Sequence, residues 1–405
     1  MDDLPADARA PPVAALVPTG AAAAELGERI RRAGPITFAE YQGAALDAFF
    51  AGGHGAGRGG RDFVTSPEVG SLFGALVARG LDETWHRLGR PDPFVVVDAG
   101  GGRGRLLADV LRAQPDCTPA LRGVLVERSP ALRAEARTLL PLEPADVVLG
   151  PFAPGDPDSP AEPIPASGPV VTALDELPAA PFPGVIIANE LLDNLPVRIV
   201  EQSEHGWMEL RVGIAPDDRR FVEVLVPAPR DLAERADDLT TDAAVTVGER
   251  LPLSLATDDW LARCGRSLLR GEVWVIDYAE PIANLLTRGP TGPSGWLRTY
   301  RAHGFGTDPL DAPGDQDVTC DLAIESLRRA AHQAGLTVRA ELDQAEWLRS
   351  LGLDAMVDEG RQGWTDGAHR GDLRAIAARS RVVEGSALTD PSGLGSHRVL
   401  LLSRP

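Results

Sequence analysis

The residues with the clearest chemical potential form a glycine-rich loop after a short apolar run. The run Phe94-Val95-Val96-Val97 ends at Asp98, and Ala99-Gly100-Gly101-Gly102-Arg103-Gly104 follows it. Glycine lets a backbone turn sharply and approach a ligand closely. In open parallel sheets such a loop lies at the carboxyl end of a strand, where ligands bind. We therefore expect a ligand to be held by Asp98, Gly100, Gly101, Gly102 and Gly104.

The spacing of these glycines narrows the class of ligand. Counted from Gly100, the sixth position of a dinucleotide fingerprint would be Arg105, so that fingerprint fails, and no lysine follows as a P-loop requires. The pattern D/E-x-G-x-G-x-G resembles motif I of class I methyltransferases. Glu127 ends the next apolar run, where a carboxylate can accept both ribose hydroxyl hydrogens. We expect S-adenosylmethionine here. The alternative is a glycine turn needed only for strand–helix packing, with Asp98 as a helix cap.

A second set of polar residues follows a later apolar run and is predicted to face the methyl acceptor. Asn189-Glu190 ends the run, and Asp193 lies three residues further on. Methyl transfer requires alignment of the reactants and, where needed, a base. A cationic acceptor would be held by carboxylates. We therefore predict acceptor contacts from Glu190 and Asp193, with Asn189 beside the cofactor. The alternative is that the two acids only order the turn before Pro196.

Three further segments carry weaker signals. Thr65-Ser66-Pro67 reads either as a helix start or as a segment that closes over the cofactor. His303 is a candidate catalytic residue in a loop, although a structural role is the alternative. Asp317 and Thr319 are expected to cap the helix that follows. The histidines lack metal-ligand spacing, so we predict no metal.

The elements that must position these residues alternate between strand and helix from residue 94 onward. Apolar strands covered by helices on both faces imply a Rossmann-like α/β fold with a seven-stranded, mostly parallel sheet. The predicted strands are 94–98, 124–127, 147–149, 185–189, 273–277, 336–338 and 399–402.

Regions outside this alternation suggest added parts. Residues 1–24 are rich in Ala and Pro and are expected to be a disordered lead-in. An N-terminal helical segment is predicted at 25–90, and the methyltransferase core at 91–405. Insertions at about 195–260, with a hairpin around residues 204–206, and at 278–318, rich in Gly and Pro, are predicted to build a lobe over the site.

Composition limits the partners and the compartment. The formal net charge of −19 repels nucleic acid and anionic lipid and suits a basic protein segment, although plain solubility also explains it. No apolar run is long enough to cross a bilayer, and the N-terminus resembles neither a secretory signal nor an Arg-rich presequence. Three scattered cysteines argue against disulfides, so the expected location is cytoplasmic. A homodimer is possible.

Ordered blocks across residues 34–355 resemble the MidA-like methyltransferases, which include the mitochondrial complex I assembly methyltransferase. The matching blocks are Gly34-Pro35-Ile36 with Tyr41, Asp62 to Val69, Leu72-Phe73-Gly74, the glycine loop through Asp109, Val126 to Arg133, Ala188 to Val197, Ile276-Asp277-Tyr278, Leu297 to His303 and Pro313 to Thr319. The resemblance implies a class I fold, bound S-adenosylmethionine and methylation of a protein arginine. The departures are Asp98 for the usual Glu, Gly101 for Pro, Val64 for Tyr and Asn194 for Ala.

Other functions remain open at this point. A protein with this fold could act as a binding assembly factor with little catalysis, or could methylate a small molecule. A nicotinamide oxidoreductase is the weakest alternative, because Arg105 breaks the fingerprint.

Overall fold

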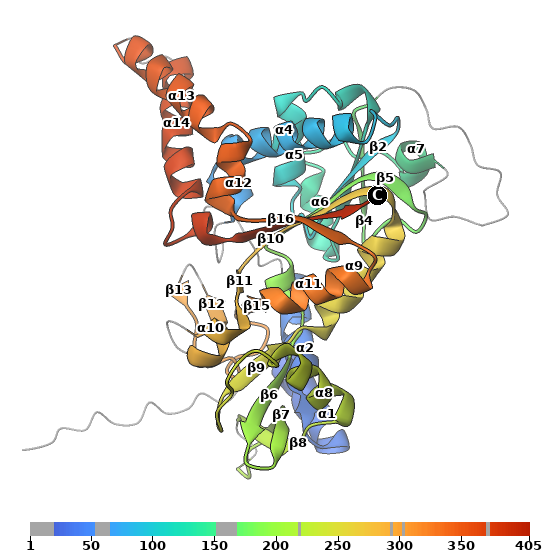
Figure 1. Cartoon of the computed structure of the whole chain (residues 1–405), viewed down its shortest axis with the longest axis vertical. Helices are drawn as coiled ribbons and strands as arrows, with labels where there is room; N and C mark the ends of the chain where they lie inside the picture. The colour runs from blue at the N-terminus through green and yellow to red at the C-terminus, as the bar shows by residue number, and fades with distance from the viewer. Residues whose placement is uncertain are drawn as a thin grey trace, which may run out of the picture.

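A computed structural model of the chain describes residues 20–52, 65–150, 168–217, 220–291, 295–301, 304–369 and 373–405. It shows a sheet-based core with a smaller lobe beneath it and a helical hairpin projecting to one side (Figure 1). Most of the predicted lead-in, and His303, lie outside the described residues. The first helix, α1 (Ala21–Ala33), begins four residues before the position predicted for it.

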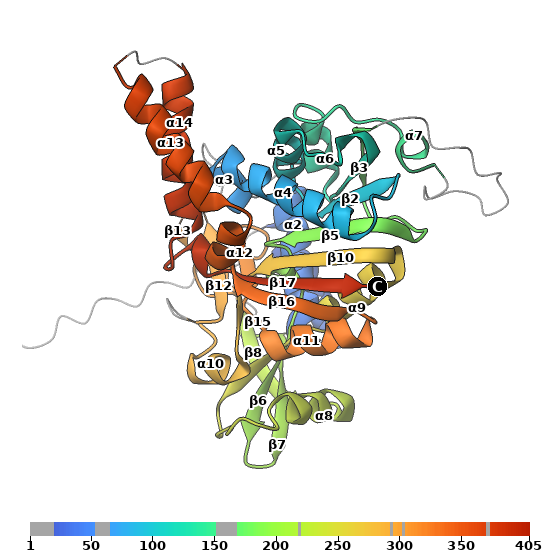
Figure 2. The same ribbon diagram turned by 45° about the horizontal axis from the view of Figure 1, so that its top comes forward.

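The core is a seven-stranded sheet in the order β16-β17-β10-β5-β2-β3-β4, seen nearly face-on in Figure 2. Five neighbouring strands are parallel, and β17 runs antiparallel to both β10 and β16. The predicted α/β fold with a mostly parallel sheet is confirmed. The strands are β2 (Phe94–Ala99), β3 (Leu121–Val126), β4 (Val170–Leu174), β5 (Phe182–Asn189), β10 (Leu268–Asp277), β16 (Thr337–Asp343) and β17 (Arg398–Arg404).

Helices cover both faces of this sheet, which explains the uninterrupted apolar runs in its central strands. One face packs against α4 (Ser71–Arg87), α5 (Arg105–Ala113) and α12 (Gln344–Ser350). The other packs against α9 (Leu255–Ser267) and α11 (Ile324–Gln333). Because every residue of β2 and β3 is buried, side chains from both faces of these strands fill the core.

The predicted third strand is wrong. Residues 147–149 belong to helix α7 (Ala145–Leu149), and the strand beside β3 is β4, which begins only at Val170. A short apolar run does not distinguish a buried strand from one turn of buried helix. In α7 the side chains of Val148 and Leu149 are buried against the sheet. Because the third strand was misplaced, the residues that follow β4 were not recognised as a wall of the cavity.

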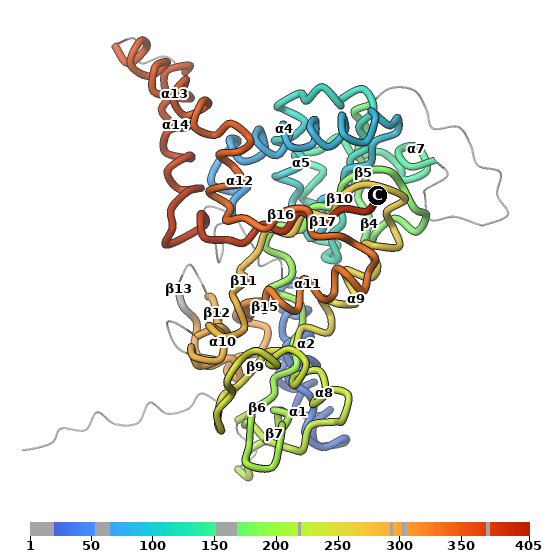
Figure 3. The backbone as a smooth tube through the Cα atoms, in the orientation of Figure 1, coloured from blue at the N-terminus to red at the C-terminus, as the bar shows by residue number. Residues whose placement is uncertain are grey.

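The predicted insertion at 195–260 forms its own antiparallel sheet and takes in the start of the chain. Strand β1 (Ile36–Thr37) pairs with β7 (Gly206–Ile214), and the helices α1, α2 (Phe38–Ala51) and α8 (Arg230–Leu239) pack on this sheet. Figure 3 shows the blue N-terminal helices beside these green strands. The predicted helical segment 25–90 is therefore divided, since α4 packs on the core. The other strands are β6 (Arg198–Ser203), β8 (Phe221–Pro227) and β9 (Arg250–Leu253).

The predicted insertion at 278–318 is more ordered than its Gly and Pro content suggested. Strands β12 (Leu297–Arg301), β13 (Gly304–Phe305) and β14 (Asp317–Cys320) form a small sheet. The expected helix-capping role of Asp317 and Thr319 is wrong, because both lie in β14. This segment also contains β11 (Ala279–Glu280) and α10 (Ile282–Thr287), and β15 (Leu322–Ala323) follows it.

The helical hairpin consists of α13 (Leu353–Gly367) and α14 (Leu373–Leu388), and its base contacts the start of α4. The buried carboxylate of Glu384 accepts a hydrogen bond from the backbone N–H of Leu72, 2.9 Å away, at the start of α4. A Cβ atom at Gly70 would lie 2.1 Å from the Glu384 Cδ, so glycine is required there. The helix start predicted at Ser66 begins the short helix α3 (Ser66–Val69), and the extended backbone of Gly70 separates α3 from α4. Within the described ranges, no helix is long and apolar enough to span a bilayer.

Candidate active site

A cavity of about 730 Å³ opens at the carboxyl ends of β2, β3, β4 and β5. This is the edge where ligands bind in open parallel sheets, and the volume is typical of a small-molecule site. Residues of α2 and α3 close it on one side, and residues of α9 close it on another. The core strands thus form the floor of the cavity, and the lobe contributes part of its walls.

The glycine loop forms one wall of the cavity. Two of its positions require glycine, each for a different reason. Gly102 has φ of 55°, and a Cβ atom there would meet nothing within 4 Å, so this side of the loop is open. A Cβ atom at Gly101 would lie 2.5 Å from the Asp98 Oδ2 and equally close to Leu125. Glycine therefore replaces the family's usual proline at a point where Asp98 and Leu125 leave no room for a side chain.

Asp98 is the penultimate residue of β2 and is almost completely buried, with 3% of its surface exposed. Burial and the nearby charge of Glu127 raise the pKa of its carboxyl to about 7. Its Oδ2 atom has no hydrogen-bond partner among the described residues. A buried acceptor without a partner is costly and is normally completed by a ligand or water. Asp98 is therefore suited to bind a cationic group that enters the cavity.

Glu127 follows β3 on the other side of the loop. Its Oε2 accepts a hydrogen bond from the Gly102 N–H at 3.1 Å, and its Oε1 accepts one from the Ser129 N–H at 2.7 Å. These two contacts fix the carboxylate against the glycine loop. Burial raises the pKa of Glu127. The fixed orientation suits a residue that receives a pair of hydroxyl groups.

Glu190 follows β5 in a backbone conformation that glutamate rarely adopts, with φ of 52°. The Ser66 N–H and the Asn189 amide both donate to its Oε1, at 3.0 and 3.1 Å, which leaves Oε2 for a ligand. Burial and the charge of Asp277 raise its pKa to about 8. Strained backbone persists where surrounding contacts enforce it, often at functional sites.

Asp193 lies behind Glu190, outside the cavity lining, in a short 3-10 helix (Leu192–Asn194). It is 4% exposed, and its Oδ1 has no partner. Asp277 Oδ2 accepts hydrogen bonds from the backbone N–H groups of Leu191, Leu192 and Asp193, so Asp277 holds this turn. Burial, then the charges of Asp277, Asp317 and Glu190, raise the pKa of Asp193.

Several residues around the site were missed by the sequence analysis. Asp175 to Ala179 follow β4 and line the cavity, and they were missed because the third strand was misplaced. Tyr278 and Arg298 lie near Asp193, and the ring of His397 packs against the Tyr278 ring, with centroids 4.1 Å apart. The imidazole of His397 is fully buried, neither of its nitrogens is hydrogen-bonded to a described residue, and burial followed by the charge of Arg298 lowers its pKa to about 3. Its only available sequence signal was its position directly before the last strand.

The structure brings most of the predicted site residues together. The cavity is lined by Thr65, Pro67, Asp98, Gly100, Gly101, Gly102, Glu127, Asn189 and Glu190. Ser66 and Gly104 are absent from that lining: Ser66 holds Glu190, and Gly104 precedes α5 with φ of 76°. Asp193 lies behind it, and His303 is outside the described residues. The individual roles of these residues stay predictions. In the described ranges, no three His, Cys, Asp or Glu residues form a group able to hold a metal.

These features fit S-adenosylmethionine and define the class of protein. Unpartnered buried oxygens of Asp98 and Asn189 occur on residues that line the cavity, and the glycine loop presents an open backbone to it. The parallel strands of the core form the floor of the cavity, in a seven-stranded sheet with one antiparallel strand between β10 and β16. The fold and the site together are those of a class I methyltransferase.

Comparisons with known proteins identify the family. The profile of an S-adenosyl-L-methionine-dependent methyltransferase family matches residues 76–342, and the chain belongs to that family. The protein arginine methyltransferase NDUFAF7, mitochondrial, of Bos taurus is 30% identical over 350 residues, covering 81% of this chain and 73% of that protein. The Homo sapiens protein of the same name is 28% identical, with the same coverage.

A solved structure supports the same conclusion. A Burkholderia thailandensis protein bound to S-adenosyl-homocysteine matches with a TM-score of 0.73 and 28% identity, covering 95% of this chain and 92% of that one. The chain is therefore an S-adenosylmethionine-dependent methyltransferase, as predicted from the glycine loop.

The predicted cytoplasmic location is contradicted, because the curated relatives bear mitochondrial names. The prediction rested on cysteine usage and on an N-terminus that resembles neither a secretory signal nor an Arg-rich presequence. Scattered free cysteines distinguish a reducing from an oxidising compartment, but they do not choose among reducing compartments.

Proposed function

We propose that this enzyme transfers a methyl group from S-adenosylmethionine to an arginine side chain of a protein. The observation that carries the proposal is Glu190, which lines the cavity and whose Oε2 accepts no hydrogen bond from the described residues, with the carboxyl groups of Asp193 and Asp277 close behind it. Such a site favours a cationic acceptor over a neutral one. The names of the relatives, which are protein arginine methyltransferases, support the same acceptor.

The residues of the chain have distinct tasks in this reaction. When bound, S-adenosylmethionine supplies an electrophilic methyl group on a sulfonium. Asp98 is suited to its ammonium group and Glu127 to its ribose hydroxyls. Glu190 Oε2 holds an N–H of the guanidinium, and its raised pKa suits it to take up the proton that the nitrogen loses.

The net charge of −19 favours an acceptor arginine that lies within a basic protein segment. It gives no support to nucleic acid or anionic membrane as a partner. A homodimer remains a proposal that size measurement in solution would test.

A labelling experiment tests the proposed function. The purified enzyme is incubated with methyl-labelled S-adenosylmethionine and a protein extract from cells that lack it, and acid hydrolysates are separated by chromatography. We expect labelled methylarginine. Because the chain contains no lysine, labelled methyllysine would have to come from an acceptor protein.

The matched variant is Glu190→Gln, which keeps the shape of the side chain and removes its charge. We expect it to lose at least about tenfold in label while S-adenosylhomocysteine affinity, measured by calorimetry, is unchanged. Label confined to small molecules, or cofactor binding with no label in any protein, would refute the proposal. The second of these results would instead favour a binding assembly factor.

A further inference from the structure

Ser66, whose backbone N–H holds Glu190, is itself held by the side chain of a residue far along the sequence. Its hydroxyl donates to the Oε1 atom of Gln344 at 3.0 Å, and both side chains are fully buried. Gln344 is the first residue of α12 and follows β16 of the core sheet. A contact across 278 positions of the chain thus reaches the residue that fixes one oxygen of Glu190.

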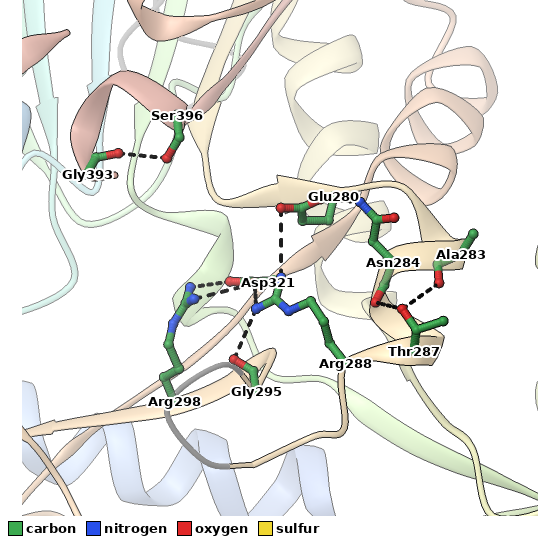
Figure 4. Close-up of polar contacts among 10 residues, drawn as sticks. All are labelled: Glu280, Ala283, Asn284, Thr287, Arg288, Gly295, Arg298, Asp321, Gly393 and Ser396. Atoms are coloured by element: carbon green, nitrogen blue, oxygen red, sulfur yellow. Dashed lines mark hydrogen bonds and ion pairs between the residues drawn. The ribbon is translucent and has the colours of Figure 1, made fainter. Parts of the chain in front are cut away.

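The side chain and the backbone of Gln344 are both anchored. Its Nε2 atom donates to the backbone carbonyl of Leu388, the last residue of α14, at 3.2 Å. Its backbone N–H donates to the carbonyl of His397 at 2.8 Å. The turn before His397 is closed by the Ser396 hydroxyl, which donates to the Gly393 carbonyl at 2.7 Å (Figure 4). Gln344 is therefore a fixed point in the fold.

The chemistry of these contacts explains why the residue is a glutamine. The Leu388 carbonyl can only accept a hydrogen bond, so the amide nitrogen must face it and the amide oxygen must face Ser66. Because that oxygen carries no hydrogen, the Ser66 hydroxyl must donate its one proton to Gln344. The proton is consequently committed to Gln344, and Ser66 contacts Glu190 through its backbone N–H.

Helix α3, which begins at Ser66, needs such a contact because it is too short to hold its own position. It comprises four residues, and an isolated helix of that length is not stable in water. Thr65 and Pro67, on either side of Ser66, line the cavity, whereas Ser66 is absent from the lining and contacts Gln344 instead. The Ser66–Gln344 hydrogen bond therefore anchors this part of the cavity wall together with the N–H that Glu190 accepts.

Glu190 depends on that N–H because its own backbone is strained. Its φ of 52° is unusual for glutamate, so the contacts around it must enforce its conformation. The Ser66 N–H at 3.0 Å and the Asn189 amide at 3.1 Å both donate to its Oε1. Asn189 is the residue before Glu190 and moves with it, whereas Ser66 belongs to a separate element. A displacement of about 1 Å in an active site can cost on the order of a hundredfold in rate.

We propose that Gln344 is a positioning residue of the active site: its amide holds the Ser66 hydroxyl, and Ser66 in turn holds the Oε1 atom of Glu190, which keeps Oε2 in place for the acceptor. Gln344 does not line the cavity, so it acts through Ser66 and not by touching the acceptor. This inference rests on the proposed function, since it assigns Oε2 of Glu190 to the guanidinium.

The test measures the rate of methylarginine formation in Gln344→Met, Ser66→Ala and the double variant, in the labelling assay described above. Gln344→Met keeps the length of the side chain and removes its amide, and Ser66→Ala removes the hydroxyl but keeps the N–H to Glu190. The plateau rate is taken at saturating S-adenosylmethionine with graded amounts of extract. We expect it to fall roughly three- to tenfold in each single variant, while S-adenosylhomocysteine affinity, measured by calorimetry, stays within about twofold.

The double variant shows whether Gln344 acts through Ser66. Both changes break the same hydrogen bond, so the double variant should be no slower than Gln344→Met. The matched control is Gln362→Met on α13, where an exposed glutamine donates to Asp366 at 2.8 Å, and its plateau rate should equal that of the wild type. If Gln344→Met fails to fold, Ser66→Ala removes the same hydrogen bond from its other end, and its rate decides.

The outcomes separate the two proposals. If the wild type produces no methylarginine, the proposed function fails and this inference fails with it. If the wild type is active and the folded Gln344→Met or Ser66→Ala variant keeps the wild-type plateau rate, the inference alone is overturned, because a purely structural role would lower thermal stability without slowing the folded enzyme. It is also overturned if the losses of the two single variants multiply in the double variant, since Gln344 would then not act through Ser66.

Discussion

At the residue scale, the site combines two features. The side-chain oxygens of Asp98 and Asn189 lack hydrogen-bond partners among the described residues, and Glu190 has a strained backbone conformation. Glu190 adopts positive φ, and Ser66 and Asn189 then fix one of its two oxygens. A non-glycine residue in this region costs on the order of 1–2 kcal/mol. The strain directs the free oxygen to a position that a relaxed strand end would not reach.

Gly102 provides a test of the cofactor loop. In Gly102→Val the new side chain would extend from an open face of the loop and would also strain a backbone at φ of 55°. We expect S-adenosylhomocysteine affinity, measured by calorimetry, to fall at least about a hundredfold, since a side chain would occupy ligand space. Circular dichroism should show an intact fold. Unchanged affinity would contradict the assignment of this loop.

Glu190 also links stability to pH. Its pKa rises from the ordinary value of 4.5 to about 8 in the folded protein, so the folded state binds the proton more tightly. This contribution to the free energy of unfolding is fully present below about pH 4.5 and is lost as pH rises through about 8. We expect thermal unfolding of the cofactor-free protein to show a smaller loss between pH 6 and pH 9 in Glu190→Gln. An identical pH dependence in both proteins would contradict this.

The site residues at the ends of parallel strands were predictable from the sequence. The residues that reach the site from inserted segments or from the antiparallel strand were not. Asp98, Glu127 and Glu190 follow recognisable apolar runs, and parallel strands bring such positions to one edge. Arg298 lies on β12 of an inserted sheet, and His397 lies directly before the antiparallel strand β17. Their positions around Tyr278 depend on how those segments fold back, which no local pattern encodes. The depth of Asp193 behind the cavity wall was unpredictable for the same reason.

At the scale of elements, the hairpin base stabilises the helices that carry Ser66. Glu384 on α14 contacts the N-terminus of α4, where unpaired backbone N–H groups favour a carboxylate. The short helix α3, which precedes this point, positions the N–H that holds Glu190. The hairpin is thus connected to the active site through this carboxylate and through Gln344, which accepts a hydrogen bond from the Ser66 hydroxyl at 3.0 Å and donates one to the Leu388 carbonyl at the end of α14 at 3.2 Å.

Replacement of this carboxylate should weaken that connection. We expect Glu384→Gln to lower the free energy of unfolding by about 1–2 kcal/mol, because the amide lacks the charge that complements the helix end. Urea unfolding measures this. Glu359→Gln, an exposed acid on α13 whose side chain is 70% exposed, is the control and should change stability little. Equal effects in the two variants would contradict the role assigned to Glu384.

Some elements were predictable and others were not, for physical reasons. The runs that became β2, β3, β5 and β10 were recognisable because they are buried on both faces. Residues 147–149 have the same composition as a strand yet form a helical turn, and only pairing with β3 could decide between them. The pairing of β1 with β7 joins residues about 175 positions apart, which short-range patterns do not predict.

At the scale of the whole molecule, the acidic net charge bears on the acceptor rather than on the cofactor. A charge of −19 attracts a basic protein over a distance that shrinks as salt is added. We expect the KM for the protein acceptor to rise several-fold between low and physiological ionic strength, while kcat and S-adenosylhomocysteine affinity change little. Initial rates at graded salt concentrations measure this. A salt-independent KM would show that the overall field does not recruit the acceptor.

The antiparallel strand β17 has a consequence for how the molecule is made. It lies inside the sheet, hydrogen-bonded to β10 on one side and β16 on the other, although it is synthesised after every other strand. Until β17 has been made and has entered the sheet, β10 and β16 each present an open strand edge. Such edges recruit other chains. A folding intermediate that lacks β17 would therefore be prone to aggregation and in need of chaperones.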